Sequence, residues 1–514
     1  MDTCQTIAQC ATGSFCDAPD RACCPALMAG GTVYADSING AAGAACCGIG
    51  GNPPCQTIAR TMRLIDAATT PDVIIRASVG GGGGNWAPSD EVYPIVLGWG
   101  IELSAPGVYF TDQGSLGVIN VTAFSAEDHV GYASITGSAV NPIWIGMDED
   151  GDQSTDKSAI AVEAGSTLYI ANATVNGNGA RASCEDPWFQ DGFGSTAIRV
   201  EGDAALLLGQ DHSAAVTGTV HIGGDGLLDG CFGILCIPGN GTDAGCTVAD
   251  ADLGGISSVV IQGQDLCDIY VGRGFSLVSN ISLTSKPVLG VPPSQVGFGQ
   301  CKTKRDKGTA VSLSAPTHMT FDNGTVQCIS GSGFYLASNG PPSAGDSLTL
   351  NINNTTIQNT DVGIDASDGI ATVTSSTIQF NHIGVYDDIE GLGAIIDLSG
   401  AGADGGRNTV VCSGIVEAAS PGYGLDYSPG IGVLNMTSTV INASNADWDT
   451  TGPDLFMCTT NDVNVPGTPC TCEIGNCTDS PGADGMDAVT TSTGTITTTG
   501  NGLSPIVCWP PDGG

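Results

Sequence analysis

The stretches "TIQNTDVGIDAS" (356–367) and "TIQFNHIGVYDD" (377–388) are two versions of one phrase, and their spacing decides the fold. In register, Ile357 matches Ile378 and Gly363 matches Gly384, a constant offset of 21 residues. Repeats of this length indicate a unit that buries its apolar face by stacking on a copy of itself. Short β-branched runs broken by Asn, Asp, Ser and Gly predict strands separated by tight turns.

Looser versions of the phrase occur elsewhere, in "AIAVEAGSTLYIANATV" (159–175), "GLLDGCFGILC" (226–236), "VVIQGQDLCDIYV" (259–271) and "GTVQCISGSGFYL" (324–336). A coil of three short strands and three turns per ~20 residues, rising ~4.8 Å per rung, is a parallel β-helix. We therefore predict an all-β fold, a single-stranded parallel β-helix with a short N-terminal capping helix and disulfide-rich ends. A compact β-sandwich with turn-rich loops is the alternative.

Composition and charge narrow the class of protein. The 514 residues include 76 Gly and only 5% aromatic residues, so we expect many turns and few helices. The 14 Lys and Arg against 53 Asp and Glu give a net charge of −39, which argues against a nucleic-acid partner. No apolar run is long enough to span a bilayer. Met1 leads no signal peptide, and we expect a mature chain whose leader has been removed.

The 21 cysteines predict disulfides. Eight of them lie in the first 55 residues, and their spacing lacks the paired Cys or His pattern of a zinc site. Disulfides in an oxidising compartment are the favoured interpretation, with at least one thiol left unpaired because the total is odd. The stretch after Cys55 places Ile58, Met62 and Ile65 on one helical face, which predicts a lid over the N-terminal end of the coil.

Four segments carry a resemblance to a known family. The stretches 31–65 and 91–107 resemble the N-terminal module of secreted bacterial β-helix proteins in the pectate-lyase-like superfamily. The stretch 442–454 is similar to their closing rungs, and 4–24 looks like the Cys-rich leaders of bacterial surface proteins. The resemblance implies a right-handed coil and a secreted or cell-surface location. We divide the chain into a Cys-rich segment (1–29), a capping module with the first coil (30–110), the β-helix (111–450) and a second Cys-rich segment (451–514).

Relatives in that superfamily cleave, epimerise or bind polysaccharides along a groove, so the resemblance directs the search for a site. A lyase needs a basic residue, and the candidates are Arg273, after a rung strand, and Lys304, in the basic cluster 301–308. Asp365, His382 and Asp387 occupy neighbouring rungs and are the candidate acid–base groups. The alternatives are a solvated loop for the basic cluster and turn formation for the aspartates.

Two further patterns point to ligands. In "DEDGDQSTD" (148–156) the residues Asp148, Asp150, Asp152 and Asp156 occupy positions 1, 3, 5 and 9 of a calcium loop, although Gln153 and Ala159 depart from the EF-hand pattern. We predict bound Ca²⁺ there, with an acidic turn as the alternative.

Aromatic side chains stack on sugars, and the proposed platforms are Trp86, Trp188 and Tyr386, with burial in the core as the alternative for each Trp.

These observations leave two functions open. The first is a secreted carbohydrate-related protein that binds a polysaccharide or cell-surface glycan along a groove, with cleavage by a lyase or hydrolase mechanism undecided. It predicts acidic, basic and aromatic side chains along one face of the coil. The second is a non-catalytic surface or matrix protein, stiffened by its repeats and capped by disulfides. It predicts no convergent site.

Overall fold

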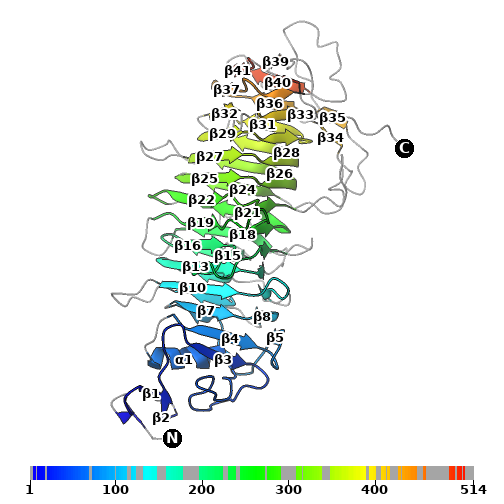
Figure 1. Ribbon diagram of the computed structural model, residues 1–514. Coiled ribbons are helices and arrows are strands. Elements are labelled where there is room, and N and C mark those ends of the chain that lie inside the picture. The colour runs from blue at the N-terminus through cyan, green and yellow to red at the C-terminus, as the bar shows by residue number, and fades with distance from the viewer. Residues whose placement is uncertain are drawn as a thin grey trace, which may run out of the picture. The chain divides into compact units, whose positions relative to one another are not determined.

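The computed structural model describes residues 4–6, 9–17, 20–68, 72–98, 100–112, 117–122, 131–147, 158–177, 196–223, 230–238, 244–272, 275–290, 308–314, 316–337, 348–388, 393–400, 407–411, 414–416, 427–429, 431–448, 455–458, 486–491, 495–499 and 502–503 (Figure 1). Over these residues the fold is all-β, with one helix and long parallel sheets. The chain forms two compact units, Met1–Gly223 with Asp229–Val259, and Gly224–Leu228 with Val260–Gly514.

The first unit contains three ladders of parallel strands. The first ladder is β3 (Thr32–Asp36), β4 (Ile74–Ser78), β7 (Ile101–Ser104), β10 (Gly131–Thr136), β13 (Ser166–Ala171), β16 (Ala205–Leu208) and β19 (Thr247–Asp250). The second is β5 (Gly84–Trp86), β8 (Val108–Asp112), β11 (Ile143–Met147), β14 (Ala173–Asn176) and β17 (Val220–Ile222). The third is β6 (Ile95–Leu97), β9 (Ile119–Val121), β12 (Ser158–Val162), β15 (Thr196–Glu201) and β18 (Gly230–Ile237). From β4 to β18 the chain visits the three ladders in turn.

The second unit repeats this arrangement. Its first ladder is β22 (Ser279–Leu283), β25 (Thr317–Asp322), β27 (Leu348–Asn353), β29 (Ile370–Thr374), β32 (Ile395–Gly400), β37 (Val440–Asn442) and β41 (Thr495–Thr497). The other two ladders share the long strands β26 (Thr325–Ala337) and β28 (Thr356–Ala366). One of them adds β20 (Val259–Ile261), β23 (Val288–Leu289), β30 (Thr377–Gln379), β33 (Thr409–Val411), β38 (Asp447–Trp448) and β42 (Gly502–Leu503). The other adds β21 (Gln264–Val271), β24 (Thr309–Ser314), β31 (Ile383–Asp387), β36 (Ile431–Asn435), β39 (Leu455–Cys458) and β40 (Met486–Thr491).

The offset of the repeated phrase is the register of the sheet. Ile357 pairs with Ile378 and Asp365 pairs with Tyr386, each 21 residues further along the chain. The register confirms the predicted repeat, because residues that match in the two phrases pair in neighbouring strands. Four successive side chains of one such stack are all buried: Val326, Ile357, Ile378 and Val410.

Single residues in the left-handed conformation bend the strands at repeating positions. Within the long strand β28, Asn359 has φ 55°, and the equivalent Cys328 and Phe380 have φ 56°. Asn354 and Ser375 form a second set of bends, with φ 47° and 50°. Asn adopts this conformation more readily than most residues, so Asn354 and Asn359 serve as bend formers, and the repeat imposes the same bend on Cys328, Ser375 and Phe380.

The helix α1 (Ile58–Ala68) lies against β1, β3, β4 and β6 at the start of the first unit. Ile58 and Ile65 are fully buried as predicted, while Met62 is half-buried and Leu64 completes the buried face. Thr57 caps the helix by accepting the backbone N–H of Arg60 at 3.0 Å. The sequence therefore placed the helix correctly and misjudged one residue of its face.

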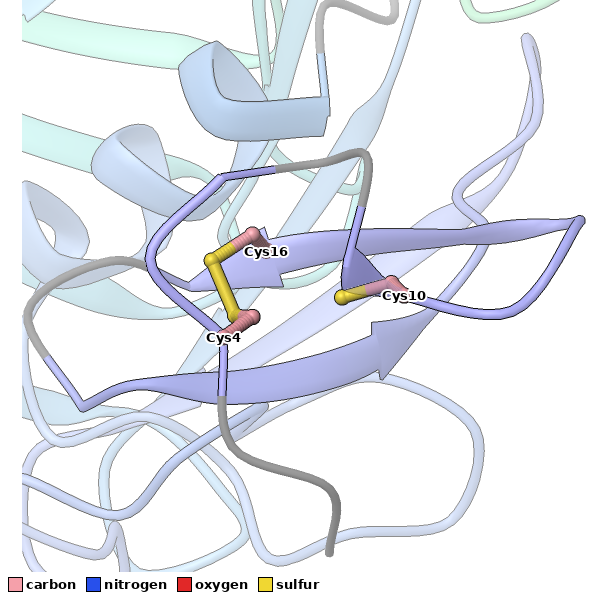
Figure 2. A group of neighbouring side chains, drawn as sticks. All are labelled: Cys4, Cys10 and Cys16. Atoms are coloured by element: carbon pink, nitrogen blue, oxygen red, sulfur yellow. A yellow bond between two sulfur atoms is a disulfide. The ribbon is translucent and has the colours of Figure 1, made fainter.

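Disulfides close the N-terminal segment. The antiparallel pair β1 (Ser14–Asp17) and β2 (Ala22–Pro25) is tied to its surroundings by Cys4–Cys16, Cys10–Cys23 and Cys24–Cys46. A fourth disulfide, Cys47–Cys55, follows in the segment before α1. The sulfurs of Cys4, Cys10 and Cys16 lie within 4.8 Å of one another (Figure 2), but all three are oxidised in disulfides and are not thiolate ligands. Disulfides, predicted in preference to zinc, are confirmed for this segment.

The described residues include a further disulfide and a free cysteine. Cys236 and Cys246 form a disulfide in the first unit. Cys267 is a buried free thiol, as expected of an odd total, and burial followed by the charge of Asp268 raises its pKa far above the ordinary value. The remaining short strands of the described residues, β34 (Gly414–Val416) and β35 (Tyr427–Pro429), form an antiparallel pair.

Candidate functional site

Several of the predicted site residues lie outside the described residues. They are the basic candidates Arg273 and Lys304, the aromatic candidate Trp188, and the calcium-loop residues Asp148, Asp150, Asp152 and Asp156. The calcium site and the basic catalytic pair therefore stay predictions.

The candidates of the repeated phrase lie in the second unit, on β28, on β31 and in the turn before β31. Asp365 and Tyr386 are neighbours in register; Asp365 accepts the Ser332 hydroxyl at 3.0 Å, and Tyr386 donates to Asp388 at 3.1 Å. His382 pairs through Nδ1 with the Asp361 carboxylate at 3.2 Å. The structure thus brings acidic and aromatic groups together here, and the contacts described for them are hydrogen bonds and an ion pair within the protein.

Asp387 does not share that surface. Its side chain is fully buried, because alternation along β31 turns it away from the side of Tyr386. The carboxylate accepts the backbone N–H of Ala394 at 3.0 Å and the hydroxyls of Thr437, at 2.5 Å, and Thr439. A carboxylate saturated by buried donors holds loops in place, and no substrate reaches it. This burial argues against a catalytic role for Asp387.

Trp86 is also buried, with 1% of its surface exposed. Its ring packs at 5.5 Å from that of Phe110, and its indole N–H donates to Glu91 at 2.8 Å. The same Glu91 carboxylate accepts the backbone N–H groups of Ile58 and Ala59 at the start of α1. Trp86 therefore has no free face for a sugar and instead links α1 to β5 through Glu91.

The first unit presents an aromatic row on its second ladder. We define the aromatic row as Tyr109, Trp144, Thr174 and His221, which are paired in register on β8, β11, β14 and β17. Their neighbours along each strand are fully buried, for example Val108 and Phe110, so alternation points the row outward. Tyr109 is 44% exposed, and its ring lies 5.9 Å from that of Trp144.

Gly146 allows Trp144 to lie along the surface. A Cβ at position 146 would meet the six-membered ring of Trp144 at 2.5 Å. The ring therefore covers the strand directly, which only glycine permits at this position. A flat aromatic surface is the geometry that sugar faces require.

The row runs into a depression of about 350 Å³ that includes His221. The other lining residues are Ser138, Ala139, Pro142, Asn172, Thr217, Gly218, Thr219, Leu253 and Ile256. Among the described residues of the row and the depression there is no carboxylate, ammonium or guanidinium group. The walls of the depression desolvate the His221 ring and lower its pKa, so the imidazole is neutral at neutral pH even though part of it stays exposed. This surface is uncharged in a chain of net charge −39.

A second group of side chains lies on the first ladder of the same unit. We define the Glu102 cluster as Glu102, Tyr132, Tyr169, Asp211 and His212. Glu102 and Tyr169 each pair in register with Ser134 of β10, from β7 and β13. The His212 ring lies 4.9 Å from Tyr132 and 6.4 Å from Tyr169. Asp211 and His212 come from the loop after β16.

Hydrogen bonds fix this loop over the ladder. The backbone N–H of His212 donates to Ser134 Oγ at 3.1 Å, and that of Asp211 donates to Val216 O at 2.9 Å. Asp211 is 2% exposed, and its Oδ2 accepts the Ser213 hydroxyl at 3.0 Å. Its Oδ1 has no hydrogen-bond partner among the described residues. A buried acceptor without a partner is costly and points to a ligand or solvent at that atom.

Electrostatics within the cluster favour added positive charge. Burial, followed by the negative charge of Asp211, raises the pKa of Glu102 above its ordinary value, against the opposing effects of His212, the Thr136 hydroxyl and Arg76. The two carboxylates of the cluster lie with one imidazole and one nearby guanidinium, and a third carboxylate, that of Asp72, accepts the Tyr132 hydroxyl at 2.5 Å. Ser134 Oγ lies 3.4 Å from His212 Nδ1, but Ser134 is fully buried and inaccessible as a nucleophile.

Neither surface was recognised in the sequence. Trp144 was not among the predicted aromatic platforms, and it lies in β11 between two buried isoleucines. The patterns "VYF" (108–110) and "IWI" (143–145), with an aromatic residue between apolar ones, carried a signal for an outward ring on a strand. The Glu102 cluster had no such signal, because its members are far apart in the sequence.

Comparison with protein-family models, with curated proteins and with solved structures finds no match to this chain. The predicted membership of the pectate-lyase-like superfamily therefore has no support beyond the fold. Among the described residues, no helix combines the length and the apolar character needed to cross a membrane.

Proposed function

We propose that the protein is a secreted right-handed parallel β-helix that binds an uncharged extracellular polysaccharide along the aromatic row. The strand order supports the coil, because the chain visits three parallel ladders in turn within each unit. Disulfides at the N-terminal end suit an oxidising extracellular compartment.

The aromatic row is the observation that carries the binding proposal. Strands of one ladder are spaced ~4.8 Å apart, which is close to the length of one pyranose unit, so the ladder offers one binding position per sugar. Tyr109 and Trp144 provide two consecutive ring faces, and Thr174 and His221 continue the row with hydrogen-bonding groups. Sugar C–H faces stack on such rings while the hydroxyls find polar partners at their edges.

Charge selects the class of polysaccharide. A uronate polymer brought to an acidic protein is repelled unless cationic groups receive it, and neither lysine nor arginine lies among the described residues of the row and depression. A neutral glucan, mannan or xylan carries no such penalty. We therefore expect neutral polymers to bind and polyuronates to bind weakly.

The test is a binding panel with matched variants. Isothermal titration with neutral and acidic oligosaccharides should show binding of at least one neutral glycan, reduced about tenfold or more by Trp144→Ala and less by Tyr109→Ala. Tyr34→Ala is the control, because Tyr34 is equally exposed at 48% but lies outside the row. Equal loss in all three variants would contradict a role for the row.

Cleavage is tested in the same samples. Reducing ends without unsaturated products indicate hydrolysis, and ultraviolet absorbance of unsaturated products indicates a lyase. Binding without either product leaves a glycan-binding protein. If no glycan of the panel binds and no product forms, the result favours the alternative of a structural surface protein.

A further inference from the structure

We propose that the Glu102 cluster is a second binding site, which takes an organic primary ammonium group between the carboxylates of Glu102 and Asp211 and beside the rings of Tyr132 and Tyr169. The site lies on a different ladder from the aromatic row. It does not depend on glycan binding by that row.

The buried carboxylate of Asp211 requires a donor. Asp211 is 2% exposed, and its Oδ1 has no partner among the described residues, while Oδ2 accepts only the Ser213 hydroxyl. A charged group with N–H donors would satisfy that oxygen and offset the repulsion between the two carboxylates. The cluster contains no lysine or arginine, and Arg76 of β4 acts on Glu102 only as the weakest of its neighbours.

The ligand is an organic ammonium rather than a metal ion. Among the described residues, the only group of three or more Cys, His, Asp or Glu ligand atoms that converges closely enough for a metal is the oxidised cysteine group near the N-terminus. Glu102 and Asp211 therefore do not form a compact oxygen cage of the kind Ca²⁺ needs. Tyr rings stabilise organic cations through their faces, and an ammonium on a carbon skeleton also contacts their carbon atoms.

The charge of the whole chain assists capture. With a net charge of −39 the protein attracts cations, and the side chain of His212 in the cluster is exposed to solvent. The ammonium pairs with the ionised carboxylate of Glu102, so its binding should weaken as acidification protonates Glu102.

Calorimetry with simple amines tests the site. Glucosamine should bind and N-acetylglucosamine should not, because acetylation removes the charge. Glu102→Gln and Asp211→Asn should each weaken glucosamine binding about tenfold or more. Glu163→Gln is the matched control, since Glu163 is a half-buried carboxylate of the same unit whose pKa is also raised by burial. Trp144→Ala should leave glucosamine binding unchanged, even if polysaccharide binding is lost.

Other outcomes decide against the site or identify its source of amine. Equal binding of the acetylated sugar, tighter binding of Ca²⁺ alone at the same residues, or unchanged affinity in Glu102→Gln would overturn the proposal. Circular dichroism of each variant verifies folding. If Asp211→Asn is unfolded, the result for Glu102→Gln alone decides the test. A glucosamine oligomer that binds more tightly than the monomer indicates an amino-sugar polymer, and equal affinity indicates a free amine.

Discussion

Both compact units are built from ladders of parallel strands, but the side chains that point outward from the ladders differ between the two units. In the second unit, Gln379 donates to Gln358 at 2.9 Å, and Gln358 donates to Gln327 at 3.3 Å, so stacked amides satisfy one another from strand to strand. In the first unit, Tyr109, Trp144 and Glu102 make few such contacts and stay accessible. A ladder whose side chains bond to their own copies gains stability, and a ladder whose side chains differ between rungs can recognise a ligand.

The difference also appears in buried carboxylates. Asp387 in the second unit and Asp36 in the first are surrounded by donors, whereas Asp211 retains an oxygen without a described partner. Carboxylates that are surrounded by donors hold loops, and removing them should destabilise the fold. Carboxylates that retain an oxygen without a partner oppose folding, and removing them should not destabilise the fold.

The largest effect is expected for Asp387→Ala. The substitution leaves the Ala394 N–H and the Thr437 and Thr439 hydroxyls without their acceptor inside the protein. We expect the free energy of unfolding to fall by about 3 kcal/mol or more. Urea denaturation monitored by circular dichroism measures the change.

Asp361→Ala is the control for that experiment. Asp361 lies in the same repeat, but its side chain is 49% exposed, and we expect a loss below about 1 kcal/mol. Similar losses for the two variants would show that Asp387 is not a special anchor of the second unit.

Asp36→Asn should give the next effect, with a pH dependence. Burial alone would raise the pKa of Asp36, but the N–H groups of Asn39, Gly81 and Ile38 and the Ser78 hydroxyl outweigh it and lower the pKa from 3.8 to about 2. A folded-state pKa below the unfolded value stabilises the fold above the unfolded pKa, and the contribution is lost as the pH falls toward 2. We expect a loss of about 2.5 kcal/mol at neutral pH.

Urea midpoints at neutral pH and near pH 3 provide the measurement. The gap between wild type and Asp36→Asn should narrow at the lower pH, because the wild-type carboxylate begins to lose its advantage. A gap that is independent of pH would mean that geometry, rather than ionisation, makes Asp36 stabilising.

The sequence revealed the repeat more fully than the site. The phrase at 356–367 and 377–388 predicted the register because identical residues stack on identical positions, and the helix after Cys55 followed from apolar spacing. The repeat itself drew attention to Asp387 and His382, which the structure uses in internal contacts. Residues that differ between neighbouring strands of a ladder, such as Trp144 and Glu102, leave no trace at the 21-residue period of the repeat. Their proximity depends on which side of each strand they occupy.

The smallest predicted effect has the opposite sign and belongs to Glu102→Gln. Burial and the charge of Asp211 raise the pKa of Glu102 above its ordinary value of 4.5. A raised folded-state pKa favours the protonated form, so the stabilisation is complete below the unfolded pKa and is lost as the pH rises through the folded value. At neutral pH the ionised carboxylate therefore opposes folding. The glutamine variant should be more stable than wild type there, by less than about 1 kcal/mol because Glu102 is half exposed.

The same urea experiment at two pH values tests this sign. The advantage of Glu102→Gln should disappear near pH 4, where the wild-type side chain is protonated. Saturating glucosamine should reverse the order at neutral pH, since the ammonium stabilises only the ionised wild-type carboxylate. A Glu102→Gln variant that is less stable at every pH would place Glu102 with Asp36 and Asp387 among the structural carboxylates. The contrast between stabilising side chains in the second unit and ligand-binding side chains in the first would then not hold for Glu102. A side chain that the fold needs is not free to exchange its partners for a ligand.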